Sequence, residues 1–354
     1  MKQAKAQTLI PTAQAETLLG MFVTHIKEDH GLTVQIEEDG THIVDEQAFR
    51  IAFGATPSGL SVDLVTPNES TLLFFKEEIV AHVAEVDEHA ATNIRWDDDA
   101  ASAGELPGNF RVLRVLDSFI LFTGMQRVIL SYPGIATHAH DGAHLRLMLP
   151  AKAGRRPVWP VMGDNGVPIW PQGDDVLHAR FITIKDINVE AETVSLDIVR
   201  HDHGFISQWA QNVKTGDDVG AMGPAGMLEL PEATSYFLAA DGTGLPCIAR
   251  FLETLDPNAR GNVVVAAPQE YDLSDYLPAT NLDIHKVAPG LFEGRIAELA
   301  QQLTKPGLTD YAFFAGEFQN AQELRKYFKK VLNLDKKTQI SATYWRRGMP
   351  GAAG

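Results

Sequence analysis

The stretch Leu177-His-Ala-Arg180-Phe-Ile182-Thr183-Ile-Lys185 decides the fold. β-Branched and aromatic residues fill its middle and neither Gly nor Pro interrupts it, so it is predicted to be one β-strand. Because side chains on a strand repeat their face every two positions, one strand can offer a cation, a flat group and a hydroxyl to a single ligand. Taken alone, the stretch is more simply explained as an ordinary strand with a surface Arg and Lys. The flanking sequence has to decide between this interpretation and a ligand-binding strand.

The sequence around this strand predicts an all-β domain. Between residues 110 and 230, short alternating or β-branched runs are separated by Gly and Pro turns, a pattern typical of a barrel. The predicted strands are Phe110–Leu116, Gln126–Leu130, His144–Leu149, Ala179–Ile184, Ala191–Val199 and Asp218–Met222.

From Glu232 onward the pattern changes to alternating strands and helices. Such alternation predicts a parallel sheet with covering helices, an architecture that often binds a nicotinamide nucleotide. The predicted strands are Ser235–Ala240, Asn262–Ala267 and Tyr311–Ala315, and the predicted helices are Leu245–Thr254, Phe292–Leu303 and Ala321–Val331.

The N-terminal part is predicted to be a small α+β domain. An amphipathic helix is expected over Ala13–Glu28, short alternating runs follow, and a second helix is expected from Asn68, where Thr71 completes a plausible cap, to about Glu88. This layout resembles the domain of unknown function 2218, a resemblance that implies a shape and no chemistry.

The acidic run Trp96–Gly108, rich in small residues, has the composition of a linker. The predicted organisation is therefore an α+β domain over residues 1–95, a linker over 96–109, a barrel over 110–231 and an α/β domain over 232–354.

Composition limits the function further. The chain has 354 residues, 45% of them hydrophobic and 21% charged, as is typical of a soluble globular protein. Its formal charge of −16 argues against nucleic-acid binding. One cysteine, Cys247, excludes an intrachain disulfide framework and favours the cytoplasm. Neither an apolar signal core nor an apolar run of about 20 residues is found, so no membrane insertion is expected.

Three further motifs follow the first strand in order. Residues His201-Asp-His-Gly204-Phe-Ile-Ser207-Gln-Trp209-Ala210 lead into a predicted helix start, where free N–H groups and a hydroxyl can hold a pyrophosphate. The loop Asp241-Gly-Thr243-Gly-Leu-Pro246 lies between a strand and a helix, which suits close approach to a nucleotide. The last motif is Tyr344-Trp345-Arg346-Arg-Gly348.

These motifs, in this order, resemble the siderophore-interacting family of flavin reductases from about Phe110 to the C-terminus. The family pattern Arg-x-Tyr-Thr-x-Arg corresponds to residues 180–185, where Ile182 replaces the stacking aromatic and Lys185 replaces Arg. At residues 205 and 206 the family's Pro-Ala is replaced by Phe-Ile, and the loop at residues 241–246 contains two glycines, like the broader ferredoxin-reductase loop. The resemblance implies a ferredoxin-NADP reductase-like fold that uses FAD and NAD(P)H.

The resemblance also implies which residues bind the cofactors. They are Arg180, Phe181, Ile182, Thr183, Lys185, His201, Gly204, Ser207, Trp209, Asp241, Thr243, Gly316, Glu317, Tyr344 and Trp345. Trp345 is expected to cover the flavin by stacking, although it and Tyr344 could equally close the apolar surface of the last strand. No catalytic acid or nucleophile is nominated, because the redox chemistry belongs to the flavin.

Other clusters have two interpretations each. Lys152, Arg155 and Arg156, together with Arg346, are nominated for binding an anionic ferric chelate, although solvated loop charges explain the first three more simply. The run His138-Ala-His-Asp141-Gly-Ala-His144 has metal-ligand types, but a loop that runs into a strand is the simpler explanation and no metal site is predicted. Cys247 at a helix start could be a reactive thiol, and a buried cysteine is the favoured interpretation.

The sequence thus predicts a cytoplasmic FAD-dependent reductase that releases iron from ferric siderophores with NAD(P)H or another electron donor. Two alternatives stay open. One is a flavin-free module on the same fold that binds siderophores or a protein partner, as Ile182 and Lys185 would favour. The other is a flavin reductase with a non-iron acceptor.

Overall fold

The computed structural model describes residues 3–28, 32–46, 49–98, 103–152, 154–202 and 204–348, so residues 99–102 of the predicted linker lie outside the described part. The chain divides into two compact units. The first comprises Met1–Arg111, Leu149–Leu177 and Gly220–Gly226, and the second comprises Val112–Met148, His178–Val219 and Met227–Gly354. In the described ranges, no helix has the length and apolar character needed to cross a bilayer.

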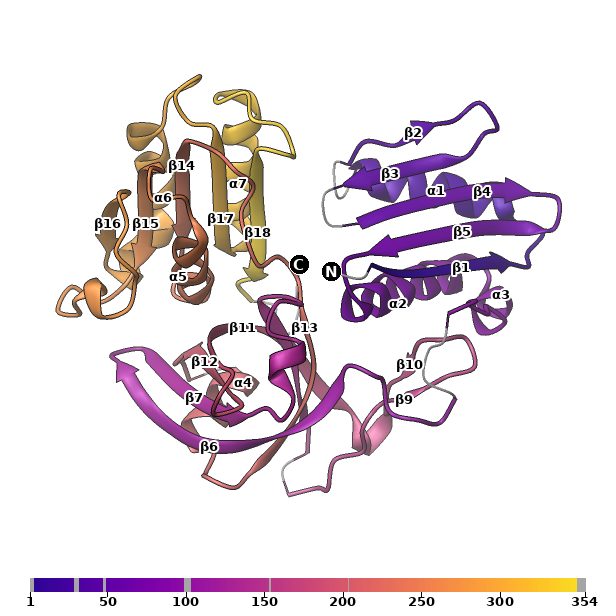
Figure 1. Ribbon diagram of the computed structural model, residues 1–354, viewed down its shortest axis with the longest axis horizontal. Helices are drawn as coiled ribbons and strands as arrows, with labels where there is room; N and C mark the ends of the chain where they lie inside the picture. The colour runs from indigo at the N-terminus through magenta and orange to yellow at the C-terminus, as the bar shows by residue number, and fades with distance from the viewer. Residues whose placement is uncertain are drawn as a thin grey trace. The chain divides into compact units, whose positions relative to one another are not determined.

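The first unit is built on a five-stranded sheet in the order β1-β5-β4-β3-β2 (Figure 1). Helices α1 and α2 supply Phe22, Ile79 and Val83 to the same core as Phe53 and Leu64 of the sheet. The strands are β1 Ala4–Ile10, β2 Gln35–Ile36, β3 His42–Glu46, β4 Phe49–Thr56 and β5 Gly59–Thr66, and the helices are α1 Ala15–Glu28, α2 Glu69–Val86 and α3 Glu88–Thr92. A short pair, β9 Val161–Met162 and β10 Pro168–Ile169, belongs to the same unit.

The start of helix α2 confirms the predicted cap. The side chain of Asn68 accepts a hydrogen bond from the backbone N of Thr71 at 2.9 Å. Strand β1 was not predicted, and it pairs antiparallel with β5 along its whole length. Its signal was present, because buried Ala6, Thr8 and Ile10 alternate with exposed residues.

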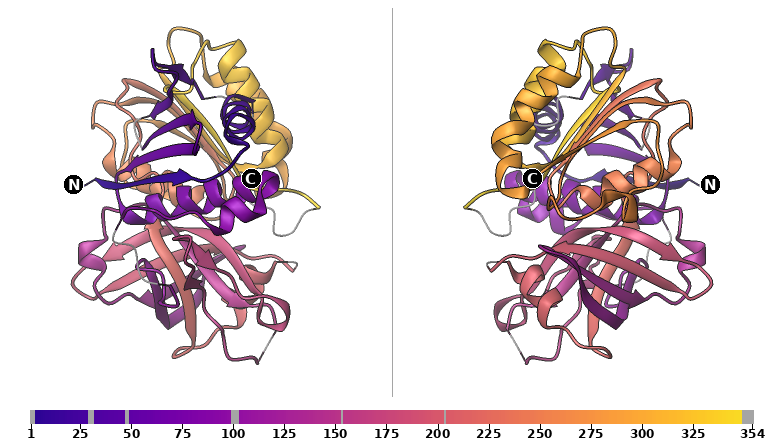
Figure 2. Two further views of the ribbon diagram at one scale, coloured as in Figure 1. Left: turned by 90° about the vertical axis from the view of Figure 1, so that its right-hand side faces the viewer. Right: turned by 90° about the vertical axis from the view of Figure 1, so that its left-hand side faces the viewer.

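The barrel is closed in the order β11-β12-β7-β6-β13-β8. The two views of Figure 2 show strands of this region from opposite sides. The barrel confirms every predicted strand of this region, and Val128, Leu147 and Ile184 in its core are fully buried. The strands are β6 Phe110–Phe122, β7 Met125–Ser131, β8 His144–Pro150, β11 Leu177–Asn188, β12 Thr193–Val199 and β13 Asp218–Ala225, and helix α4 Phe205–Asn212 follows β12.

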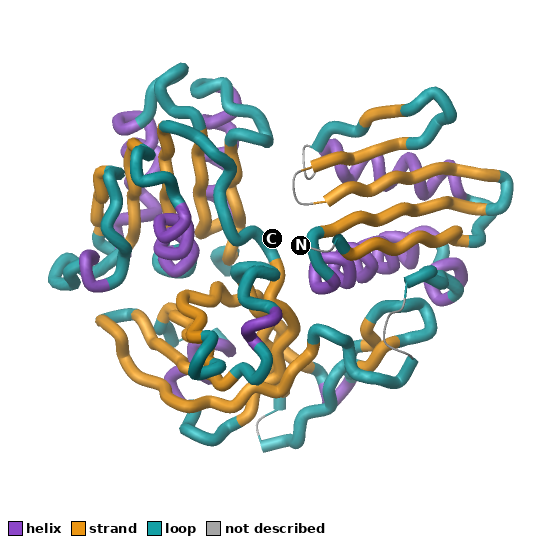
Figure 3. The backbone as a smooth tube through the Cα atoms, in the orientation of Figure 1, coloured by secondary structure: helices purple, strands orange, loops and turns teal. Residues whose placement is uncertain are grey.

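The C-terminal part of the second unit is a parallel sheet in the order β16-β15-β14-β17-β18. Helix α5 packs on one face with Phe251, and α6 and α7 pack on the other with Phe292 and Phe328, so the central strands are buried on both sides (Figure 3). The strands are β14 Ser235–Ala240, β15 Arg260–Ala266, β16 Asp283–Val287, β17 Tyr311–Glu317 and β18 Gln339–Trp345, and the helices are α5 Leu245–Thr254, α6 Pro289–Leu303 and α7 Phe318–Lys330.

The first unit contains a buried charge that ties α2 to the segment after α3. The ammonium of Lys76, 1% exposed, lies 2.5 Å from the Asp98 carboxylate and 5.2 Å from the centre of the Trp96 ring. Burial lowers the pKa of Lys76, and the hydrogen bond that its ammonium donates to Asp98 opposes that shift. Both partners are therefore needed to hold this segment against the helix.

Replacing Asp98 by Ala should reduce the free energy of unfolding by about 3–5 kcal/mol, because it leaves the Lys76 ammonium buried without its carboxylate. Urea unfolding of the full chain measures this. Asp45→Ala, at an exposed position of β3, is the control and should change the value by less than about 0.5 kcal/mol. Equal effects of the two substitutions would show that the Lys76–Asp98 pair contributes nothing specific.

Candidate cofactor-binding site

The carboxyl ends of the central parallel strands bring Asp241, Gly316 and Trp345 together. Asp241 follows β14 directly, and its Oδ1 accepts hydrogen bonds from the backbone N and the Oγ1 of Thr243 at 2.8 and 2.6 Å. Its Oδ2 accepts a bond from Trp345 Nε1 at 2.7 Å. Burial raises the pKa of the Asp241 carboxyl, while the bonds from Thr243 and Trp345 oppose that shift.

Glycine at two positions allows this close approach. A Cβ at Gly316 would lie 2.6 Å from Oδ2 of Asp241, and a Cβ at Gly244 would lie 2.9 Å from Ala315. Any larger residue at Gly316 would push the carboxylate away from Trp345. The sequence placed Asp241, Thr243, Gly316 and Trp345 in one site; that their side chains contact one another is a finding of the structure.

Glu317 has a structural task at the end of β17. Its carboxylate caps helix α7, accepting bonds from the backbone N of Gln319 and, at 3.4 Å, of Asn320. It also accepts a bond from the backbone N of Arg347 at 3.3 Å. Its oxygens are thus engaged by the protein's own backbone.

Tyr344 links the last strand to the barrel. Its hydroxyl lies 3.1 Å from His144 Nε2 on β8 and is hydrogen-bonded to Thr183 on β11 and to the thiol of Cys247. Burial raises the pKa of Cys247 to about 12, and the residue is 1% exposed, which confirms the interpretation as a buried cysteine. Thr183 is buried as well, so its hydroxyl is positioned by Tyr344.

The first half of β11 carries the cationic part of the site. Burial, and then the charge of Arg146 on the neighbouring strand β8, lower the pKa of Arg180. The ring of His178, two residues earlier, contacts the ring of Phe205 in a tilted arrangement, with ring centres 4.0 Å apart and planes inclined by 45°. Phe181 is 45% exposed, with the Arg146 guanidinium 5.7 Å from its ring centre. Ile182 is half-buried.

Helix α4 begins beside this strand. Its N-cap residue is Gly204, with no side-chain cap hydrogen bond, so the backbone N–H groups of the first turn have no capping side chain. A Cβ at Gly204 would lie 2.1 Å from the His201 ring. Ser207 exchanges hydrogen bonds with the backbone of His201 at 2.8 and 3.1 Å, so its hydroxyl closes this turn. Trp209 is half-buried within the helix.

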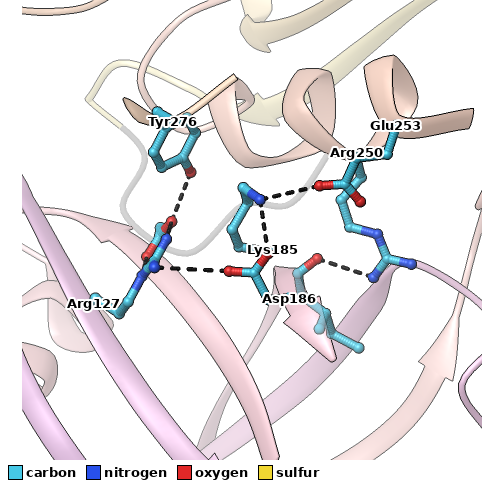
Figure 4. A network of polar contacts seen from close by, with 8 residues as sticks. Arg127, Lys185, Asp186, Arg250, Glu253 and Tyr276 are labelled. Atoms are coloured by element: carbon cyan, nitrogen blue, oxygen red, sulfur yellow. Dashed lines mark hydrogen bonds and ion pairs between the residues drawn. The ribbon is translucent and has the colours of Figure 1, made fainter. Parts of the chain in front are cut away.

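Lys185, at the far end of the motif, belongs to a network that joins the barrel to the α/β part of the same unit (Figure 4). Its ammonium lies 2.8 Å from Asp186 and 3.3 Å from Glu253 on α5. In the same network, Asp197 receives two bonds from Arg127 at 2.8 Å and one from the Tyr276 hydroxyl at 2.7 Å. The charge of Lys185 is therefore balanced at this interface.

The nominated substrate-binding residues belong to both compact units. Lys152 and Arg155 lie in the first unit and pair with Asp174 and Asp175 at 3.2 and 2.6 Å. Arg156 is exposed there, and Arg346 in the second unit lies 4.3 Å from the ring centre of Phe318. Local carboxylates thus balance two of the three loop cations, as the solvated-charge interpretation expects.

The histidine-rich loop is engaged locally. His138 Nδ1 lies 2.8 Å from Asp141, and His144 contacts Tyr344. Over the described residues, no group of three or more His, Cys, Asp or Glu side chains is arranged to hold a metal ion.

The chemistry of the site fits FAD. Arg180 and an uncapped helix start suit the two negative charges of a pyrophosphate, since guanidinium and backbone N–H groups are its usual donors. Arg180 and the first turn of α4 would hold the pyrophosphate, with Thr183 on the flavin side. Ile182 can supply an apolar contact to a ring but not aromatic stacking.

Comparison with known proteins gives the same domain pair. Residues 115–228 match the siderophore-interacting FAD-binding domain, and residues 233–348 match the siderophore-interacting protein family. Together these matches cover more than half of the chain, and neither includes the N-terminal α+β region.

Relatives and solved structures agree with these matches. The ferric vibriobactin reductase ViuB of Vibrio cholerae is 26% identical over 59% of this chain and 78% of its own. The NADPH-dependent ferric-chelate reductase of Escherichia coli is 26% identical over 67% of this chain and 92% of its own. A siderophore utilization protein from T. fusca is 27% identical with a TM-score of 0.60, over 71% of this chain and 98% of its own. The siderophore-interacting protein SipS from Aeromonas hydrophila is also 27% identical, with a TM-score of 0.56, over 68% and 93%.

Replacing Asp241 by Asn should reduce the free energy of unfolding by about 1–3 kcal/mol. In either orientation of the amide, its NH2 group faces an N–H or O–H donor, from Trp345 on one side or Thr243 on the other. Denaturant unfolding followed by tryptophan fluorescence measures the effect. Asp256→Asn, at an exposed turn, is the matched control; an unchanged stability of the Asp241 variant would contradict the bonding described here.

Replacing Tyr276 by Phe should cost about 1–2 kcal/mol of unfolding free energy, because Asp197 loses one hydrogen-bond donor while it keeps Arg127. The control is Tyr271→Phe, since the Tyr271 ring packs on Phe122 with centres 4.2 Å apart and retains that contact without its hydroxyl. Thermal or denaturant unfolding compares the two variants. The network would not stabilise the interface if both variants behaved as wild type.

Proposed function

Because the chain belongs to the siderophore-interacting protein family, we propose that it is an FAD-dependent reductase that releases iron from ferric siderophores with NADPH as the electron donor. The observation that carries the proposal is the contact between His178 on β11 and Phe205 at the start of α4, which brings the strand of Arg180 to a helix start without a side-chain cap, a donor set that suits a pyrophosphate. The names of the V. cholerae and E. coli relatives support iron(III) as the acceptor, and the latter supports NADPH.

Each part of the site has a task in this function. Arg180 binds the pyrophosphate, and Thr183, held by Tyr344, orients a hydroxyl toward the flavin side. Trp345, fixed by Asp241, closes that side and limits the access of water. The loop at Asp241–Pro246, after β14, is the expected contact for the nicotinamide nucleotide.

When bound, FAD supplies the conversion between a two-electron donor and a one-electron acceptor. Reduction frees the metal because oxygen-rich siderophores hold iron(II) far less tightly than iron(III). The acceptor is the ferric siderophore, and the protein's contribution is positioning and electrostatics.

The alternative is a module that binds siderophores without flavin, and Ile182 in place of a stacking aromatic is the residue that favours it. The two functions differ in a simple observable. A reductase retains FAD through gel filtration and its flavin absorption bleaches with NADPH, whereas the module stays colourless after incubation with FAD.

Replacing Arg180 by Ala should weaken FAD binding roughly 10- to 100-fold, because a hydrogen bond between charged groups contributes about 1.5–3 kcal/mol. Titration of FAD fluorescence measures the affinity. Arg295→Ala, at an exposed position of α6, should bind FAD as wild type does.

Reduction of a ferric siderophore is followed separately, with an iron(II)-specific chelator and with NADH compared against NADPH. Retained FAD without iron(II) release would indicate a non-iron acceptor. If Arg180→Ala and Arg295→Ala both bound FAD as tightly as wild type, Arg180 would not belong to the site.

A further inference from the structure

The contacting rings of His178 and Phe205, inclined to each other by 45°, are not used by the function described so far. Phe205 is the first residue of α4 and is 39% exposed, and its ring centre lies 4.0 Å from that of His178. Because this apolar ring is partly exposed at the start of the helix, its burial there contributes little to stability. The ring does, however, offer a flat surface beside backbone N–H groups that are free of a capping side chain.

The register of β11 places these rings at one end of the binding strand. His178, Arg180 and Ile182 alternate along the strand and share a face, which spans about 13 Å from the first to the last. Arg180 lies in the middle of this row. Thr183, tied to Tyr344, lies at the opposite end from His178.

We infer that His178 and Phe205 form an aromatic platform for the adenine ring of FAD. The inference rests on the proposed function, because it takes the pyrophosphate to lie at Arg180 and the flavin to lie toward Thr183. An FAD molecule carries its adenine on the other side of the pyrophosphate from the flavin. The adenine then falls at the His178 end of β11, where the two rings meet.

The electrostatics of the platform suit a neutral base. Burial, and then the charge of Arg180, lower the pKa of His178, which favours the uncharged imidazole. An uncharged ring next to an arginine leaves the positive charge for the phosphates and a flat face for the base.

Phe205 stands where the family pattern has proline, so this ring is a feature of the present chain. Stacking of a base on an aromatic side chain contributes enough to be measured by alanine substitution. The platform therefore provides, at the adenine end, aromatic contact that Ile182 does not provide at the flavin end. It also predicts a selectivity for FAD over FMN, which lacks the adenylate.

Titration of FAD and of FMN with wild type and with Phe205→Ala tests the inference. Phe205→Ala should bind FAD about tenfold more weakly and FMN with unchanged affinity. Phe205→Tyr should retain the FAD affinity. The matched control is Phe119→Ala, because Phe119 on β6 has the same exposure of 39% and should affect neither flavin.

The outcomes separate the two proposals. Wild type that binds neither flavin overturns the proposed function and the platform with it. Wild type that binds FAD, together with a Phe205→Ala variant that binds it equally well, overturns the platform alone. Equal weakening of FAD and FMN would mean that Phe205 supports the fold of the site, and displacement of FAD by a catechol but not by ADP would assign the rings to the siderophore.

Discussion

A buried carboxylate between two domains of the second unit holds the candidate site together. The side chain of Asp197 on β12 is fully buried, and a charge there is tolerated only because Arg127 forms two bonds with it and Tyr276 a third. Arg127 and Asp197 come from the barrel, whereas Tyr276 comes from the connection between β15 and β16. The neighbouring pair of Lys185 and Glu253 spans the same interface. These contacts determine how β11 faces the carboxyl ends of β14 and β17.

Strand β11 therefore has two different ends. Its first half carries the aromatic side chain of His178 and the cationic side chain of Arg180. In its second half, Thr183 is hydrogen-bonded to Tyr344 and Lys185 pairs with Glu253 across the interface. The replacement of Arg by Lys at position 185 is understandable in this setting. A single flexible ammonium can bond to Asp186 and Glu253 at once, and a planar fork for phosphate is not required there.

Much of the fold was predictable because both domains of the second unit show strong periodicity. The strands that begin at Ser235 and Tyr311 are apolar except at one end, as is usual for strands covered on both faces, and Asn68 marked the start of its helix by cap chemistry. Strand β16 escaped prediction because it is an edge strand with exposed Asp283 and Ile284. Strand β1 escaped for another reason: Lys5 and Gln7 on its outer face made a regular alternation resemble a polar terminus.

The site was predictable in its members but not in its contacts. Motif order identified Asp241 and Trp345, yet their bond depends on β18 lying next to β17, a pairing that local sequence does not encode. The same holds for Tyr276, which has no motif around it and becomes important only through Asp197.

Ile182 and Phe205 both depart from the family's sequence pattern, and contacts in the structure change how these departures are interpreted. Read separately, each substitution weakens the case for a cofactor, since one removes an aromatic residue and the other removes a proline from a helix start. The fold places Ile182 on β11 and brings Phe205 of α4 against His178, on the other side of Arg180 along that strand. One departure removes an aromatic ring from the strand while the other adds one beside it, so the capacity to bind a planar, anionic molecule is redistributed along the length of the strand. The sequence alone, in which 23 positions separate the two residues, offers no means of seeing that relation.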